Sequence, residues 1–165
     1  MKPSKIKSVR AKLTKLLPSF FSAITWKGTI YCRTKSSVEA INKTDGIDSV
    51  LENHETIHVR QAESTKDSWF RFYLEYVWEW IKNLPLIFGG WFMPYYFMPM
   101  ELEAYACQEI MNYTLNGPIT GWKKLKKLKI KEKYSLINLY KERKRYNYKF
   151  HDFAKDEILP LINEG

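Results

Sequence analysis

The chain has 165 residues, a length typical of one domain with a core large enough to fold alone, which leaves no room for a second catalytic domain. Aromatic residues make up 16% of it, a composition that excludes disorder over the central part. Its two cysteines, Cys32 and Cys107, lack CxxC spacing, which excludes a disulfide framework and a cysteine zinc site, so we expect two free thiols.

The net charge of +9 lies in the flanks of the chain. Residues 120–149 hold twelve Lys or Arg against two Glu, and residues 1–20 hold six and no acid. Such flanks attract anionic surfaces, either phospholipid headgroups or nucleic acid. Nucleic-acid binding is the less favoured alternative, because no recognised nucleic-acid module accompanies the charge. The alternatives for these flanks are thus solvated helix faces and peripheral contact with an anionic membrane.

The N-terminal pattern predicts an amphipathic helix over residues 5–17 that ends at Pro18. The apolar run 16–21 is short and contains that proline, so we expect no cleaved signal peptide and a cytoplasmic location. Alternation over 23–32 predicts one strand, with Gly28 at a bulge or at a close backbone approach. A polar loop is expected from there to Gly46.

The next segment contains the sequence His54-Glu55-Thr56-Ile57-His58, an HExxH motif. Ser49 and Glu52 have capping-box spacing, so the helix that carries the motif should begin near residue 49. Positions i and i+4 share a helix face, so both imidazoles can reach one ion while Glu55 lies beside it. The motif therefore predicts a zinc site with His54 and His58 as ligands.

Residues 68–82 predict a helix with one narrow polar stripe and a wide aromatic face. This face is most simply part of the core, and the alternative is a surface that contacts lipid or substrate. Between Lys82 and Glu101 no residue is charged, but prolines and glycines interrupt the run, so we expect a buried or interfacial loop rather than a membrane span. Helices are expected from Pro99, over 122–147, and over 151–162.

A catalytic zinc needs a third protein ligand, for which Glu101, Glu103 and His151 are the candidates. The run Glu101-Leu102-Glu103-Ala104-Tyr105 resembles the second helix of the gluzincins, a group of zinc peptidases that includes thermolysin-like and membrane-linked enzymes. The resemblance covers about residues 18–110, and the HETIHxxQ run and the aromatic helix are also similar to small bacterial gluzincin-like proteins. It implies Glu101 as third ligand and Tyr105 as the neighbour that assists the site, although those families often have aspartate there.

The resemblance implies a fold and an activity. The fold is mainly α (α+β), a minimal zincin-like domain with an active-site helix, a glutamate-bearing helix and a short edge strand. We expect a basic N-terminal segment (1–18), the metal-binding domain (19–118) and a basic helical extension (119–165). The implied activity is zinc-dependent hydrolysis of a peptide or protein substrate with Glu55 as general base. Such a reaction needs a further hydrogen-bond donor to the developing oxyanion. The candidates for this donor are Tyr95, Tyr96, Tyr105 and His151. Strand 24–32 would lie at the edge, with residues 29–31 facing a peptide. The alternative is a catalytically silent zinc module that docks on an anionic membrane or a protein.

Overall fold

The computed structural model describes residues 10–16, 23–43, 49–115 and 118–163. The chain divides into two compact units, Met1–Trp69 with Gln108–Ile119, and Phe70–Cys107 with Thr120–Gly165. The described parts are mainly helical and include one small three-stranded sheet, which confirms the predicted α+β class. The segments 1–18, 19–118 and 119–165, which rest on charge and resemblance rather than on packing, stay a prediction.

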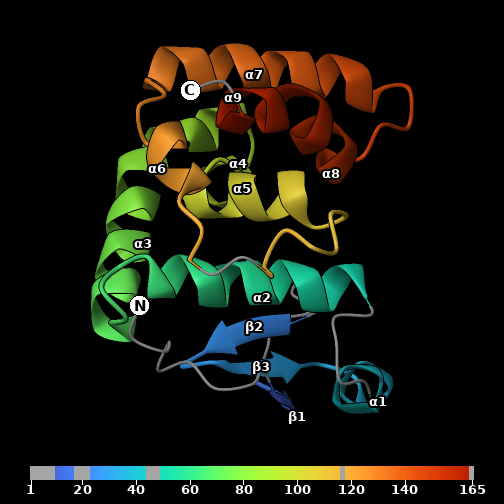
Figure 1. Cartoon of the computed structure of the whole chain (residues 1–165). Coiled ribbons are helices and arrows are strands. Elements are labelled where there is room, and N and C mark those ends of the chain that lie inside the picture. Colours follow the sequence, from blue (N-terminus) through green and yellow to red (C-terminus); the bar gives the residue numbers. More distant parts are fainter. Residues whose placement is uncertain (1–9, 17–22, 44–48, 116–117, 164–165) are drawn as a thin grey trace. The chain divides into compact units, whose positions relative to one another are not determined.

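The first unit contains a sheet and two helices (Figure 1). Its elements are β1 (Arg10–Leu13), β2 (Ala23–Trp26), β3 (Thr29–Cys32), α1 (Lys35–Lys43) and α2 (Val50–Glu63). The strand order is β1-β3-β2, with β1 parallel and β2 antiparallel to β3. β3 is therefore the central strand, and β2 lies at an edge of this sheet.

The single strand predicted over 23–32 is wrong, because the chain reverses at Lys27 and Gly28 into a hairpin. Lys27 and Gly28 have φ values of 48° and 78°. A two-residue turn with positive φ at both positions matches the twist of paired strands, and glycine is typical at the second position. Gly28 is thus a turn residue rather than a bulge.

The helix predicted over 5–17 is also wrong where the structure can be compared with it. Residues 10–13 form β1, while residues 5–9 and 17 lie outside the described residues. Pairing with β3 overrides the helical spacing.

The segment predicted to be a polar loop contains helix α1. Asn42 of this helix accepts a hydrogen bond from Ala11 N at 2.9 Å and donates one to Ala11 O at 3.0 Å.

Helix α2 begins where the sequence predicts. The side chain of Ser49 accepts a hydrogen bond from Glu52 N at 3.1 Å, as an N-cap residue does. The helix has 14 residues and ends at Glu63, and its middle is almost wholly buried although many of its residues are polar. Buried polar residues need defined partners, so this helix is built around specific contacts rather than around apolar packing alone.

The second unit is helical in all its described elements (Figure 1). They are α3 (Trp69–Asn83), η1 (Leu84–Gly89), α4 (Met93–Tyr96), α5 (Pro99–Cys107), α6 (Gly121–Leu125), α7 (Ile130–Lys144), α8 (Phe150–Phe153), η2 (Ala154–Ile158) and α9 (Leu159–Asn163). Helix α5 starts at Pro99 as predicted, and all its residues except Tyr105 are buried. The helix predicted over 122–147 is two helices, because the chain turns between Leu125 and Ile130. The helix predicted over 151–162 lies within the run from α8 to α9.

Gly121 is required by a close approach inside this unit. A Cβ atom at this position would lie 2.3 Å from Glu103 Oε1 and 2.7 Å from Ile162 Cγ2. We expect Gly121→Ala to lower the free energy of unfolding by about 1–3 kcal/mol, because a buried site that is already filled cannot accept another carbon without strain. Urea unfolding followed by circular dichroism measures this. A variant as stable as the wild type would show that the two neighbours move at no cost.

Helix α3 is oriented differently from the sequence prediction. Glu79, expected on a wet stripe, is only 1% exposed, whereas Phe70, expected in the core, is 73% exposed. The reason is that cations surround the carboxylate, with Lys82 Nζ at 2.6 Å and Lys126 Nζ at 3.7 Å from Glu79 Oε1.

Within the ranges that the structure describes, no helix has the length and apolar character needed to cross a bilayer.

Candidate metal centre

Helix α2 presents the two motif histidines on one buried face. His54 and His58 are four positions apart, and their ring centroids lie 5.1 Å from each other at an interplanar angle of 81°. Both side chains are buried. A pair of imidazoles one helical turn apart is suited to bind a single metal ion.

Each imidazole is held through its Nδ1 atom by a glutamine amide oxygen. His54 Nδ1 lies 3.0 Å from Gln108 Oε1, and His58 Nδ1 lies 2.9 Å from Gln61 Oε1. An amide oxygen accepts hydrogen bonds, so in both rings Nδ1 carries the proton and Nε2 keeps its lone pair. Such contacts fix the tautomer and the ring orientation of metal-binding histidines.

The segment that supplies Gln108 is fastened to α2 by two further polar residues. Asn53 Nδ2 donates to Gln108 O at 2.7 Å and to Ile110 O at 3.1 Å, and Arg60 Nε donates to Thr114 O at 3.0 Å. These bonds explain why α2 buries polar side chains beside the motif. Gln108 is a residue that the sequence does not reveal, because its partner is 54 positions away.

Glu55, the predicted general base, is held by strand β2. Its side chain is buried, and Oε2 accepts a hydrogen bond from Thr25 Oγ1 at 2.7 Å. Thr25 is thus a second residue that sequence reasoning missed.

Burial, with Glu55 as a further cause, raises the pKa of the nearby Cys32 thiol to about 11, so this thiol stays protonated at neutral pH. Both cysteines are free thiols, as predicted.

The predicted orientation of the substrate strand is wrong in one respect. Residues 29–31 belong to β3, which pairs with β1 on one side and with β2 on the other. A strand with both sides occupied cannot accept an added peptide. The edge strand beside Glu55 is β2 instead.

Glu101 lies on α5 within a group of tyrosines in the second unit. It is 1% exposed, and its Oε1 accepts a hydrogen bond from Tyr76 Oη at 2.6 Å. Burial and, next, the Glu101 charge raise the pKa of Tyr95 well above its ordinary value, so this hydroxyl remains neutral. Tyr76 was missed from the sequence, where it reads as one more aromatic residue of α3.

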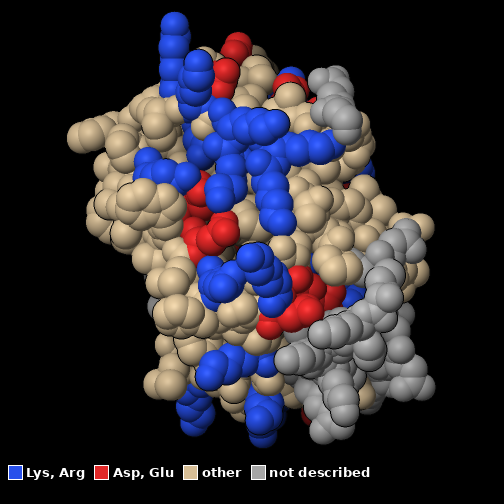
Figure 2. All heavy atoms as spheres, turned by 60° about the vertical axis from the view of Figure 1, so that its left-hand side comes forward, with Lys and Arg blue, Asp and Glu red and all other residues tan. Residues whose placement is uncertain are grey.

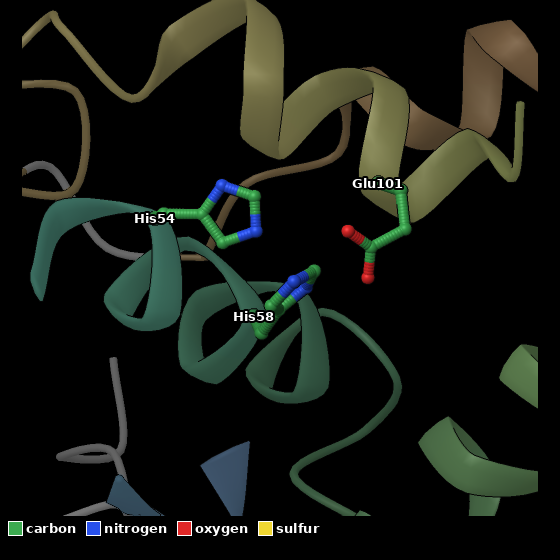
Figure 3. A group of neighbouring side chains, drawn as sticks. All are labelled: His54, His58 and Glu101. Carbon is green, nitrogen blue, oxygen red and sulfur yellow. The ribbon is translucent and has the colours of Figure 1, made fainter. Parts of the chain in front are cut away.

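One ligand atom from each of His54, His58 and Glu101 lies within 4.8 Å of the other two. Figure 3 shows the two imidazoles and the carboxylate directed toward one another. All three side chains are buried. Two imidazole nitrogens and one carboxylate are a donor set that suits zinc and matches sites with an open fourth position. The residues thus fit the metal that the motif implies, while their role as ligands stays a prediction.

The other candidate residues have different neighbours. Glu103 is fully buried against Gly121 of α6, whose added Cβ would touch its Oε1. His151 Nε2 lies 3.4 Å from Asp152 Oδ1. Tyr105 is half-buried, and its ring centroid lies 5.7 Å from that of Tyr96 and 5.2 Å from that of Phe150. The assisting role of Tyr105 stays a prediction.

Comparison with models of protein families, with curated proteins and with solved structures gives no match for this chain.

Proposed function

We propose that the chain is a zinc-dependent metallopeptidase in which His54, His58 and Glu101 hold the metal and Glu55 acts as general base. The observation that carries this proposal is the buried group of three ligand side chains. Each Nδ1 has a glutamine acceptor, which is how zinc-binding histidines are typically oriented. The resemblance to the gluzincins points to the same set of residues.

The donor set favours zinc over harder cations, because imidazole nitrogen suits zinc whereas calcium and magnesium prefer oxygen alone. Zinc held in this way supplies Lewis acidity, which polarises a peptide carbonyl and acidifies a water molecule. The protein itself supplies fixed ligand orientations and a carboxylate beside the ligands.

Glu55 adjoins His54 in the helix, and we assign it the proton transfers of the reaction. Its carboxylate takes the proton from the attacking water and then delivers it to the nitrogen of the leaving amine. The hydrogen bond from Thr25 at 2.7 Å keeps the carboxylate oriented during both transfers. A general base with a fixed orientation acts with a smaller loss of entropy than a mobile one.

Strand β2 is the element we propose to contact the substrate backbone. Among the described residues it pairs with β3 on one side only, and its Ile24 and Trp26 are exposed on either side of the buried Thr25. An extended peptide could add to the outer edge of β2 through main-chain hydrogen bonds. This arrangement would select an unfolded segment or a loop rather than a folded surface.

The test is zinc removal and return on the full-length protein. We expect the zinc-loaded protein to cleave members of a fluorogenic peptide library, dialysis against a chelator to reduce cleavage to background, and added zinc to restore it. Calcium and magnesium serve as control ions and should not restore cleavage. Hydrolysis that survives complete zinc removal would contradict the proposal.

The same experiment separates the second candidate, a catalytically silent zinc module that docks on an anionic membrane or a protein partner. The specific observation that favours it is the basic sequence of residues 120–149, which hydrolysis does not require. A protein that binds zinc tightly and cleaves no peptide would support this candidate. Peripheral contact with an anionic membrane is compatible with both, and we include it in the proposal.

A further inference from the structure

One exposed face of α3 is apolar, although the helix also exposes Arg71 and Lys82. Phe70, Leu74, Val77 and Ile81 follow one another at intervals of four, three and four positions, which places them on one face of the helix. All four are exposed, and so is Trp78 beside them. The opposite face contains the buried Phe72, Glu79 and Asn83. A surface helix normally shows the reverse distribution, with charged residues toward water.

The apolar surface continues past the end of α3. In η1 and the turn after it, Phe88 is 88% exposed and Trp91 is 77% exposed. We call the exposed apolar residues of this continuous stretch the α3–η1 surface; they are Phe70, Leu74, Val77, Trp78, Trp80, Ile81, Leu84, Ile87, Phe88, Trp91 and Phe92. Scattered apolar residues are ordinary on a protein surface, but an exposed set of this size marks an interaction site.

Cationic side chains lie directly beside this surface, within the same unit. Lys126 Nζ lies 2.9 Å from Glu75 Oε2, which attaches the basic segment after α6 to α3. Tyr134 of α7 donates to Pro85 O in η1 at 2.6 Å. The segment from α6 to the start of α7 contains five exposed lysines, which are Lys123, Lys126, Lys127, Lys129 and Lys131. Figure 2 shows Lys and Arg side chains gathered on the face that carries α3 and α6, with uncharged surface next to them.

We propose that the α3–η1 surface inserts into the interfacial layer of an anionic phospholipid membrane, with the neighbouring lysines on the headgroups. Two observations select a bilayer. The lysines complement anionic headgroups, and tryptophan, present three times in the surface, is enriched at the depth where headgroups meet acyl chains. A helix with an apolar face and adjacent cations lies in the plane of the interface.

This inference rests on the membrane contact included in the proposed function and goes further, because it names the inserting residues and requires burial of apolar side chains. It is independent of zinc. A protein that cleaves no peptide could still insert into a membrane, so that result would not contradict this inference. A protein that does not insert could still bind zinc, so that result would not contradict the proposed metal centre.

The test is co-sedimentation of the full-length protein with vesicles of phosphatidylcholine containing phosphatidylserine, and with vesicles of phosphatidylcholine alone. We expect binding to the anionic vesicles together with a blue shift of tryptophan fluorescence. Phe88→Ser should weaken binding about tenfold, because it removes one buried aromatic side chain from the bound state. Lys127→Gln should weaken it about fivefold at low salt and less at high salt.

The matched control is Tyr146→Ser, which removes an aromatic residue that is 85% exposed in the same unit but outside the α3–η1 surface. Its binding should equal that of the wild type, and all variants should keep the wild-type circular dichroism spectrum. Salt-sensitive binding that Phe88→Ser leaves unchanged would overturn insertion and retain electrostatic docking only. A stable dimer that binds no vesicle, and that Phe88→Ser dissociates, would overturn the proposal and assign the surface to a second copy of the chain.

Discussion

Replacing Glu55 by glutamine is expected to lower peptide hydrolysis by about 100- to 10,000-fold, the usual contribution of a general base. Glutamine has nearly the same shape and can still accept a hydrogen bond from Thr25 Oγ1, which now lies 2.7 Å from Glu55 Oε2. It cannot take up a proton at neutral pH. The loss should therefore appear in kcat, with zinc content equal to that of the wild type.

Steady-state kinetics on cleaved members of the peptide library, with zinc measured on the same samples, checks this expectation. Glu52→Gln is the matched control, because Glu52 is buried on the same helix but belongs to its N-terminal cap rather than to the motif face. It should retain activity. Equal kcat values for the wild type and Glu55→Gln would remove Glu55 from the reaction and leave the silent zinc module as the better account.

Replacing Glu101 by glutamine is expected to weaken zinc binding by more than about 100-fold, since even residues that only support a ligand contribute about 10- to 100-fold. The substitution keeps the volume and leaves an amide oxygen that can accept the hydrogen bond from Tyr76, now 2.6 Å from Glu101 Oε1. It removes the negative charge, and a neutral amide is a poor zinc ligand. Competition with a chromophoric chelator measures the change in affinity.

Glu103→Gln is the control for this experiment, because Glu103 is on the same helix, is equally buried and lies against Gly121. Its zinc affinity should equal that of the wild type even if its stability falls. Loss of zinc from Glu103→Gln with normal binding by Glu101→Gln would exchange the two carboxylates and reject Glu101 as a ligand.

The parts of the molecule that local sequence determines could be predicted. Helix α2 follows from the Ser49 cap and from the spacing of its motif, and α5 follows from a proline at its first position. Both features involve residues within one helical turn. The spacing on α2 predicted His54 and His58 as ligands, whereas Glu101 was selected among Glu101, Glu103 and His151 by the resemblance to the gluzincins.

The remaining features depend on contacts between distant residues. β1 becomes a strand because β3 offers a partner, and α3 exposes its apolar face because Lys82 and Lys126 hold Glu79 inside. The residues that support the site share this property. Thr25 and Gln108 lie 30 and 54 positions from the side chains they contact, and Tyr76 lies 25 positions from Glu101. No pattern in one sequence reports such pairs.

The position of bound zinc is the most direct test of the proposed centre. Diffraction from crystals of the zinc-loaded protein, recorded on either side of the zinc absorption edge, locates the ion without reference to its ligands. We predict one site with His54 Nε2 and His58 Nε2 at about 2.0–2.1 Å and a Glu101 oxygen at about 2.0–2.2 Å. A zinc ion bound without the two histidines, or completed by Glu103 or His151 in place of Glu101, would contradict the account.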